Sequence, residues 1–371
     1  MTEHDESHDP QGSPSTQTPQ LRAGVVGCGA IAHEHLDHLS SSPLVDLVAV
    51  CDHSPVARRF AADRYSVPEV DPDADQLLGR GLDVIHVCTP PATHADIVMK
   101  ALDTGHHVIC EKPLAPNAVI AAELLDRAAA RGLTLVESQN YRWNDPVLAI
   151  DRLIGEGTLG EVREVEILLS ADLTAGPFGD LNLRGPGVDL PAGAVHDFLP
   201  HLSYLFLHFA DHDGPVDDVI GRLANISANP RVGYDHLDAL VAAGPVRGHL
   251  RVASDLAPDG FRIAVRGTAG GVETDLYQPY LRVQRSTDSG IRAPIEQLRS
   301  GAKLAAASLA NAASKVLQHG GYHGIPRMLD AVYGALLSGG PTPIPPAWVL
   351  SASKLNDRLA GLAEPGSSRQ S

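Results

Sequence analysis

A glycine-rich turn carries the first pattern with a chemical meaning. Gly27-Cys28-Gly29-Ala30-Ile31-Ala32 follows directly after the apolar run Ala23 to Val26 and fits G-x-G-x-x-A. In that pattern one glycine makes the turn, the next lets the backbone approach a pyrophosphate, and the small third residue packs a helix on a strand. We therefore expect Gly27, Gly29, Ala30 and Ile31 to bind a dinucleotide at the helix N-terminus. The alternative is a tight strand-to-helix turn without a ligand.

An acidic residue follows at the end of the next apolar run. Asp52 stands where a carboxylate can bind both ribose hydroxyls of NAD and repel the extra phosphate of NADP. Arg58 and Arg59 come shortly afterwards, either as solvated charges on a helix or as partners for a 2′-phosphate. The sequence therefore predicts NAD as the cofactor and leaves NADP possible.

A proline-rich turn ends another apolar run, in Cys88-Thr89-Pro90-Pro91-Ala92-Thr93-His94. Two prolines fix an extended backbone where a cofactor would cross the sheet edge, so Thr89 and Pro90 are predicted cofactor contacts. The hydroxyl of Thr93 either joins them or caps the helix that follows. His94 either contacts the substrate or cofactor, or covers the end of that helix.

Glu111-Lys112-Pro113 ends a further apolar run. The proline restricts the residue before it, so Lys112 is expected outside regular structure at the mouth of a sheet. A lysine beside a cationic nicotinamide should have a lowered pKa, which suits proton transfer to or from a reacting oxygen. In isolation, the same tripeptide is common on protein surfaces.

These motifs and Gln139-Asn140-Tyr141-Arg142, in this order and spacing, resemble the glucose-fructose oxidoreductase / inositol dehydrogenase / MocA family (Gfo/Idh/MocA). The resemblance extends from about residue 20 to residue 363. It implies a Rossmann domain, a C-terminal domain with an open sheet, NAD(P) and sugar-like substrates. It also places Glu111, Lys112 and Asn140 at the cofactor, and Arg142 at the substrate.

The family usually carries an Asp and a His four residues apart on one helix of the second domain. Here Asp197 and His201 match that pair, and residues at this spacing share a helix face that can point at Lys112. An alternative alignment uses His196 as the family histidine but puts Ala192 at the acidic position. The resemblance thus implies Lys112, Asp197 and His201 as catalytic residues, with His196 as a further substrate contact. The other interpretation is that both histidines only bridge helix and sheet. Leu199 and Tyr204 depart from the family pattern.

The elements that would position these residues change character along the chain. Up to about residue 140, short Val/Ile/Leu-rich runs alternate with helical segments, which is typical of a doubly wound parallel sheet. After that, helical stretches at 193–209, 295–318, 324–338 and 346–363 accompany six strand-like runs joined by short turns such as AAGP and APDG. The predicted class is therefore an α/β Rossmann domain at residues 21–140 and an α+β domain with an open, mainly antiparallel sheet at residues 141–364. Residues 1–20 are a predicted flexible tail, and residues 365–371 a frayed end.

Composition narrows the class of protein. The 371 residues carry a formal net charge of −16, and such an acidic surface repels nucleic acid. The chain has no apolar run long enough to cross a membrane, and four cysteines, too few for a disulfide framework, so we expect a soluble, reduced, cytoplasmic protein. His33, His35 and His38 lack a zinc-binding pattern, so we expect no metal.

The sequence as a whole predicts an NAD(P)-dependent dehydrogenase or reductase that acts on a CH-OH group of a sugar, polyol or nucleotide-sugar. His201 or Lys112 would handle the proton, Lys112 would polarise the oxygen, and Asp197 would orient the site. A second hypothesis is an NAD-dependent glycosidase that oxidises its sugar transiently, and a third is a scaffold without turnover. Arg184, Tyr322 and His323 are plausible substrate contacts, and a homodimer or homotetramer is expected by resemblance.

Overall fold

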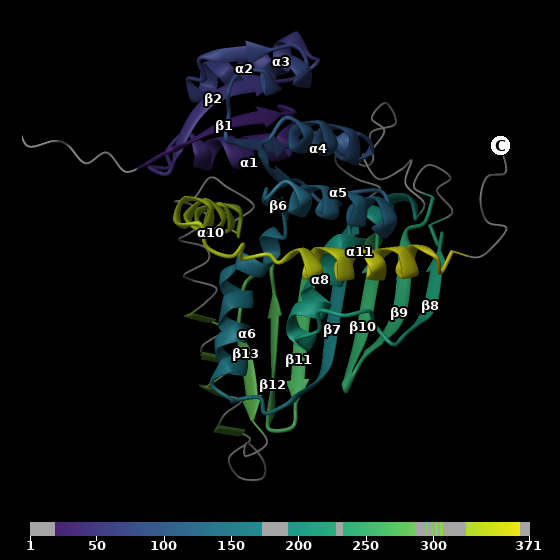
Figure 1. Cartoon of the computed structure of the whole chain (residues 1–371). Coiled ribbons are helices and arrows are strands. Elements are labelled where there is room, and N and C mark those ends of the chain that lie inside the picture. Colours follow the sequence, from purple (N-terminus) through teal and green to yellow (C-terminus); the bar gives the residue numbers. More distant parts are fainter. Residues whose placement is uncertain are drawn as a thin grey trace, which may run out of the picture.

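Two sheets organise the protein. The computed structural model describes residues 19–172, 192–227, 233–285 and 324–363, together with 294–295, 298–299, 301–302 and 305–306. A six-stranded sheet with flanking helices forms the first domain, and a seven-stranded sheet, covered by helices on one face, forms the second (Figure 1).

The first sheet is parallel throughout, in the order β3-β2-β1-β4-β5-β6. Its strands are β1 (Leu21–Val26), β2 (Val45–Cys51), β3 (Glu69–Asp71), β4 (Val84–Val87), β5 (His107–Cys110) and β6 (Leu135–Glu137). All four residues of β4 are buried, as expected for a strand covered on both faces. The chain order reverses between β1 and β4, so a crevice opens at the carboxyl ends of these two strands.

Helices connect these strands, and polar caps set where several of them begin. They are α1 (Ala30–Leu39), α2 (Pro55–Tyr65), α3 (Ala74–Leu78), η1 (Pro91–Thr93), α4 (His94–Asp103) and α5 (Ala118–Ala130). Side chains of Ser54, Asp73 and Asn117 accept hydrogen bonds from backbone N–H groups in the first turns of α2, α3 and α5. By contrast, Gly29 begins α1 without a side-chain cap, which leaves that helix N-terminus open to a ligand.

The second sheet is mixed, in the order β13-β12-β11-β7-β10-β9-β8. Its strands are β7 (Val162–Asp172), β8 (Asp218–Ala224), β9 (His236–Ala243), β10 (Val246–Ala253), β11 (Asp255–Gly267), β12 (Gly270–Asp275) and β13 (Arg282–Arg285). Only the central pair β7 and β10 is parallel; the remaining pairs are antiparallel. This arrangement confirms the predicted open, mainly antiparallel sheet.

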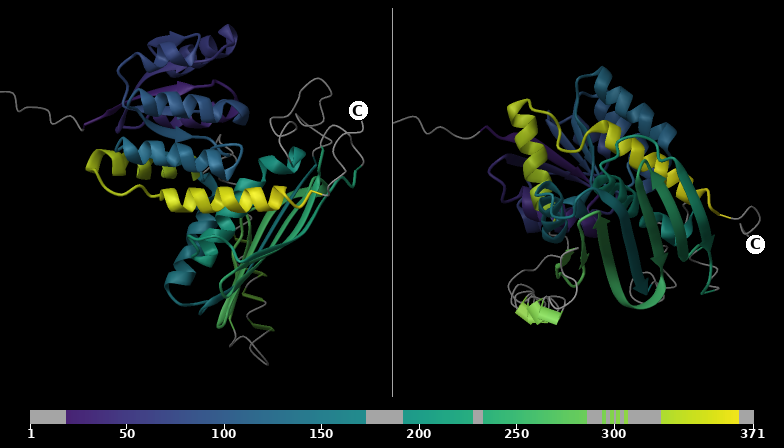
Figure 2. Two further views of the ribbon diagram at one scale, coloured as in Figure 1. Left: turned by 45° about the vertical axis from the view of Figure 1, so that its right-hand side comes forward. Right: turned by 90° about the horizontal axis from the view of Figure 1, so that it is seen from below.

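The remaining helices lie on the second domain and at the chain's end, and the last two along the chain contact both domains. These helices are η2 (Asn140–Trp143), α6 (Asp145–Gly155), η3 (Gly193–Asp197), α8 (Leu199–Ala210), α10 (Gly324–Ser338) and α11 (Pro346–Ala360). Helix α11 packs against α8 of the second domain and α5 of the first, along the junction seen in Figure 2. Helix α10 contributes Met328, Leu329 and Val332 to the core of the first domain. The C-terminal segment therefore returns to the first domain, which the predicted division at residues 140/141 does not anticipate.

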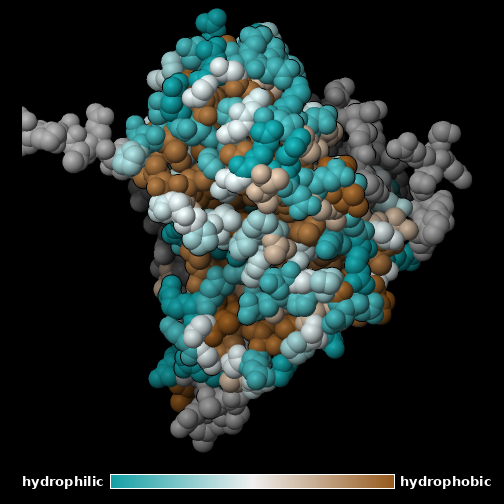
Figure 3. All heavy atoms as spheres, in the orientation of Figure 1, coloured by the Kyte–Doolittle hydropathy of each residue, from teal (hydrophilic) through white to brown (hydrophobic). Residues whose placement is uncertain are grey.

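Hydrophilic and hydrophobic side chains are distributed differently over the surfaces of the two domains. On the face in Figure 3, hydrophilic side chains predominate over the first domain, while hydrophobic atoms show between the helices below it. No helix among the described residues is both long and apolar enough to cross a membrane.

Two local predictions were wrong in detail. The predicted helix over 193–209 is a 3₁₀ turn, η3, followed by α8, with Phe198 between them. The APDG segment is not a turn between strands but an irregular stretch inside β11, where the register against β7 shifts between Asp255 and Gly260. Most of the predicted helix over 295–318 lies outside the described residues.

Candidate active site

A cleft of about 1390 Å³ lies where the two domains meet. The carboxyl ends of β1, β2, β4 and β5 form one wall, and β7, η3, α8 and β11 contribute to the other. Its lining includes most of the predicted cofactor residues, namely Gly27, Gly29, Ala30, Ile31, Asp52, Thr89, Pro90, Glu111, Lys112 and Asn140. Asp197 and His201 line it from the second domain.

The glycine turn leaves this cleft open at the N-terminus of α1. Gly27 has φ +92°, and a Cβ there would approach the carbonyl carbon of Cys88 to 2.7 Å, so both conformation and space require glycine. A Cβ on Gly29 would meet nothing within 4 Å. The two glycines therefore differ: the first permits the fold of the turn, and the second keeps the helix end clear for a ligand.

Asp52 is held rigidly beside this turn. Its Oδ2 accepts a hydrogen bond from Cys28 N (2.8 Å) and its Oδ1 one from Ser54 N (2.8 Å). Arg58 donates to the backbone oxygens of Asp52 and His53, and thus closes the turn after β2. Neither Arg58 nor Arg59 lines the cleft, whereas two acidic residues that sequence reasoning missed, Asp73 and Asp75, do.

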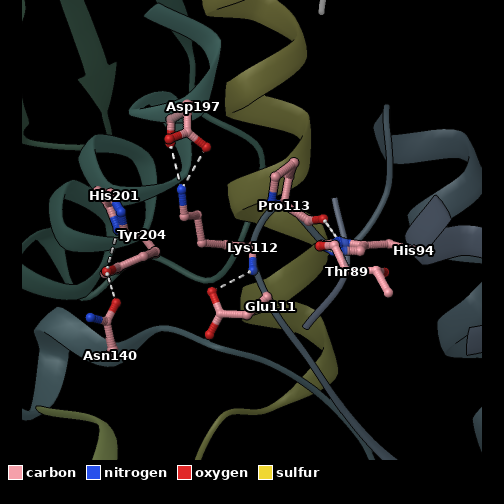
Figure 4. A network of polar contacts seen from close by, with 9 residues as sticks. All are labelled: Thr89, His94, Glu111, Lys112, Pro113, Asn140, Asp197, His201 and Tyr204. Carbon is pink, nitrogen blue, oxygen red and sulfur yellow. Dashed lines mark hydrogen bonds and ion pairs between the residues drawn. The ribbon is translucent and has the colours of Figure 1, made fainter. Parts of the chain in front are cut away.

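His94 lies beneath the cleft instead of lining it. Its Nδ1 is 2.7 Å from the carbonyl oxygen of Pro113, and its Nε2 is 2.8 Å from that of Thr89 (Figure 4). Burial lowers the pKa of this fully buried imidazole. His94 therefore joins the turns that carry Thr89 and Lys112, and the interpretation of it as a contact residue is not supported. Thr93 occupies the N-cap position of α4, but its hydroxyl donates back to Pro90 O (2.9 Å), so it does not cap the helix.

Lys112 and Asp197 meet across the domain boundary. Lys112 Nζ donates to Asp197 Oδ1 (2.7 Å) and to the Asp197 carbonyl oxygen (3.0 Å), as Figure 4 shows. The exposed fractions of the two side chains are 16% and 17%, so the pair is partly shielded from water. Attraction between such charges is stronger than at an open surface, and it fixes the ammonium group in the cleft. Asp197 is in η3 and His201 is in α8, so the two residues do not share one helix as predicted, although both line the cleft.

His201 is the third member of this group. Burial, and then the charge of Lys112, hold the pKa of His201 well below its usual value, so its imidazole is neutral. Its Nδ1 lies 2.8 Å from the hydroxyl of Tyr204, which accepts from Tyr141 N (3.3 Å) and lies 3.5 Å from Asn140 Oδ1. When Nδ1–H donates to Tyr204, Tyr204 donates to Asn140 and Nε2 is the acceptor nitrogen. Tyr204 appeared in the sequence only as a departure from the family pattern, so its part in orienting His201 was missed.

Two predicted substrate contacts lie elsewhere. Arg142 stacks on Trp348, 4.8 Å from the ring centroid, and donates to Gln139 Oε1 (3.1 Å). His196 is a buried residue of η3, and burial lowers its pKa to about 4. Neither is among the residues that line the cleft, whereas His201 is, so the geometry favours His201 over His196 as the family histidine, and substrate contact by Arg142 and His196 stays a prediction. Asp172, Asp259 and Tyr277 line it instead; no motif marked them in the sequence.

The remaining predictions concern three substrate contacts, a metal site and the cysteines. Arg184, Tyr322 and His323 fall outside the described residues. Among those that are described, no group of three or more His, Cys, Asp or Glu side chains is arranged to hold a metal ion. The four cysteines are buried and unpaired.

Comparison with known proteins agrees with this geometry. Residues 21–139 match the family described as "Oxidoreductase family, NAD-binding Rossmann fold", GFO_IDH_MocA. The first domain of this chain, over residues 21–139, belongs to this family. A dTDP-3,4-didehydro-2,6-dideoxy-alpha-D-glucose 3-reductase of Streptomyces violaceoruber is 35% identical over 178 residues, which cover 48% of this chain and 51% of the reductase.

More distant relatives match over a greater length. The inositol 2-dehydrogenase of Rhizobium meliloti is 26% identical over 280 residues, which cover 74% of this chain and 81% of that enzyme. An oxidoreductase domain protein from Kribbella flavida, 22% identical, has a TM-score of 0.78 and covers 93% of this chain and 97% of its own. The fold is therefore shared with the K. flavida protein over nearly the whole chain, whereas the match to the S. violaceoruber reductase spans only about half its length.

Proposed function

We propose that this member of the family is an NAD-dependent dehydrogenase that oxidises a hydroxyl carbon of a sugar or polyol, or reduces the matching carbonyl. The observation that carries this proposal is the ion pair of Lys112 and Asp197 beside a neutral His201, at the cleft that the glycine turn opens. A base, a fixed cation and a helix N-terminus in one cleft meet the requirements of hydride transfer with proton removal.

The residues divide the work as follows. In the oxidation direction, His201 Nε2 accepts the proton of the substrate hydroxyl as the carbon–oxygen double bond forms. Lys112 stabilises the negative charge that develops on that oxygen, and Asp197 keeps the ammonium group in place. Bound nicotinamide supplies the hydride acceptor, so the carbon is oxidised and the cofactor reduced. Reduction reverses each transfer.

Charge in the cleft supports NAD over NADP. Asp52, Asp73 and Asp75 line the first-domain wall at and near the end of β2, and a 2′-phosphate there would meet three carboxylates. Arg58 is already engaged with two backbone oxygens, and Lys100, which does line the cleft, is paired with Asp75.

Charge also supports neutral or amine-bearing substrates over phosphate-bearing ones. Among the described residues that line the second-domain wall, the charged side chains are Asp172, Asp197 and Asp259. A nucleotide diphosphate on this wall would face like charge, whereas a sugar hydroxyl or amine can donate to these carboxylates. We therefore rank free sugars, polyols and aminosugars above nucleotide-sugars.

The test is absorbance at 340 nm with purified protein, NAD or NADP, and a panel of sugars, polyols, aminosugars, nucleotide-sugars and aryl glycosides. Net reduced cofactor with one class would establish the dehydrogenase and name its substrate. Aglycone release without net reduced cofactor would replace the proposal with the NAD-dependent glycosidase. Light scattering on the same sample tests the expected homo-oligomer.

A further inference from the structure

A chain of four buried side chains runs through the first domain and ends at the cleft. Tyr333 on α10 contacts His86 on β4 (hydroxyl to Nε2, 2.8 Å), and His86 contacts His35 on α1 (Nδ1 to Nδ1, 3.0 Å). His35 Nε2 in turn lies 3.0 Å from Glu111 Oε1. Both histidines are fully buried, and Glu111 stands directly before Lys112. The mechanism proposed above uses neither histidine nor Tyr333.

Donor and acceptor capacities give this chain one direction. An ionised Glu111 can only accept, so His35 donates from Nε2–H. A neutral His35 then has a bare Nδ1, which must accept from His86 Nδ1–H. The bare Nε2 of His86 accepts in turn from the Tyr333 hydroxyl. Every group in the chain is thus satisfied with both imidazoles neutral, and the three protons all point toward Glu111.

The reverse direction leaves a buried donor unsatisfied. If His35 were an imidazolium, His86 would donate from Nε2–H to Tyr333, and the Tyr333 hydroxyl proton would need another acceptor. His86 is the sole hydrogen-bond partner that the described part of the chain gives to Tyr333. A buried donor without a partner costs about 1–3 kcal/mol, so the direction toward Glu111 is favoured.

We propose that His35, His86 and Tyr333 hold Glu111 ionised at the edge of the cofactor cleft, and that its fixed negative charge favours the oxidised, cationic nicotinamide over the reduced, neutral one. The second half of this statement rests on the proposed dehydrogenase function. In these terms His35, His86 and Tyr333 are positioning residues that act through Glu111, and α10 ties the C-terminal segment to the redox site.

The electrostatic surroundings agree with an ionised Glu111. Burial opposes the charge of Glu111, but the hydrogen bond from His35, any positive charge on His35, the hydroxyl of Ser138 and the charge of Lys112 act the other way, and the pKa of Glu111 lies below its usual value. The neighbouring Glu137 has its pKa raised by burial, so the pKa values of the two carboxyl groups differ in opposite directions from the usual value. Other titratable groups that interact with the Glu111 charge are Cys88, His94, Cys110, Lys112 and Tyr204.

The decisive readout is the ratio of dissociation constants for NAD⁺ and NADH, measured by calorimetry without substrate. Glu111→Gln removes the charge with little change in shape, and we expect it to weaken NAD⁺ relative to NADH by roughly tenfold. His35→Leu removes the donor, which raises the pKa of Glu111. At low pH the Glu111 carboxyl of His35→Leu should be neutral, so its ratio of NAD⁺ to NADH dissociation constants should approach that of Glu111→Gln. At high pH the carboxyl should be ionised, and the ratio should approach that of wild type.

Matched variants separate this role from packing. His35→Gln keeps an N–H donor toward Glu111 and should stay within about twofold of wild type. Tyr333→Phe keeps the ring and should shift the ratio by roughly twofold to threefold. His38→Gln also breaks a contact between α1 and α10, the exposed pair His38 and Asp330 (2.9 Å), and should leave the ratio unchanged.

Three results would overturn the proposal. One is that the folded His35→Leu variant has the same ratio of NAD⁺ to NADH dissociation constants as wild type at every pH. Another is that His35→Leu shifts the ratio of dissociation constants as much in the Glu111→Gln background as in wild type. Such a shift could not act through the Glu111 carboxylate. The third is any other pair of tautomers than the one expected. Histidine ¹⁵N chemical shifts in the cofactor-free protein should show His35 protonated on Nε2 and His86 on Nδ1.

The tautomer measurement also separates this proposal from the proposed function. If wild type bound neither NAD⁺ nor NADH, the dehydrogenase and the electrostatic half of this inference would both be wrong. The predicted tautomers would then still establish the directed chain, and any other pair of tautomers would refute it.

Discussion

The two walls of the cleft are built on different physical principles. The first-domain wall consists of strand ends and the turns that follow them, in which backbone conformation decides the geometry, as at Gly27. The second-domain wall consists of side chains from η3, α8, β7 and β11, which approach one another only after the long strands have paired. In the proposed function, the wall set by backbone turns would bind the cofactor, and the wall set by side chains would choose the substrate.

Loss of the contact between the walls should have the largest effect. Lys112→Ala removes the cation that faces the developing oxyanion, and we expect turnover to fall by about 10³ while NAD affinity changes little. Stopped-flow turnover and calorimetry measure the two quantities. The matched control is Lys100→Ala, another cleft lysine, which pairs with Asp75 at the surface and should stay within about threefold. Unchanged turnover in Lys112→Ala would remove this residue from the mechanism.

The backbone character of the first wall is tested by its two glycines. Gly27→Ala forces a Cβ against the Cys88 backbone at positive φ, and should lower the free energy of unfolding by about 3 kcal/mol or more. Gly29→Ala meets no protein atom, so its stability should stay within about 0.5 kcal/mol while NAD binding weakens by roughly tenfold. Chemical denaturation and calorimetry distinguish them. Similar losses of stability in both variants would contradict the distinction.

Buried histidines of the second domain predict a pH dependence of stability. His196 has a folded pKa of about 4 against an ordinary value of 6.5, so between these pH values the unfolded chain binds more protons. Stability should therefore fall as pH drops from 6.5 to 4, by an amount approaching about 3 kcal/mol from this residue. His201 adds to the same slope. Urea titrations of wild type and His196→Gln measure it, and an equal slope in both would refute the assignment to His196.

Cofactor choice is assigned to the first wall alone. Asp52→Ser removes the nearest charge to a 2′-phosphate and should lower the ratio of NADP to NAD dissociation constants by roughly tenfold. Calorimetry with both cofactors measures the ratio, and turnover with saturating NAD serves as the control. An unaltered ratio would transfer the discrimination to Asp73 and Asp75.

The smallest expected effect concerns the orientation of His201. Tyr204→Phe keeps the ring but removes the hydroxyl that partners Nδ1, so we expect kcat to fall by roughly fivefold with little change in KM. Steady-state kinetics across pH measure both. A change confined to KM would show that Tyr204 shapes the substrate site instead of orienting the base.

Sequence reasoning succeeded where chemistry is local. Gly27, Asp52 and Lys112 each follow an apolar run, and the carboxyl ends of parallel strands meet at one edge, so these residues of the first wall could be predicted, although Asp73 and Asp75 were missed. It did not anticipate that Arg142 and His94 lie outside the cleft lining, because a motif shows which turn a residue occupies but not which way its side chain points. Asp172 and Asp259 carry no signal, because their neighbourhood arises from the pairing of β7 with β11.

By itself, the sequence determined the Rossmann domain and the glycine turn, and it predicted Lys112, Asp197 and His201 as the reacting triad. Tertiary structure alone decided that Asp197 and His201 belong to different helical segments yet converge on Lys112. It also decided that α10, more than 200 residues after β4, supplies the last hydroxyl of the buried chain to Glu111. Periodicity and turn residues act over a few positions, whereas directed hydrogen bonds between distant side chains exist only once the core has closed around them.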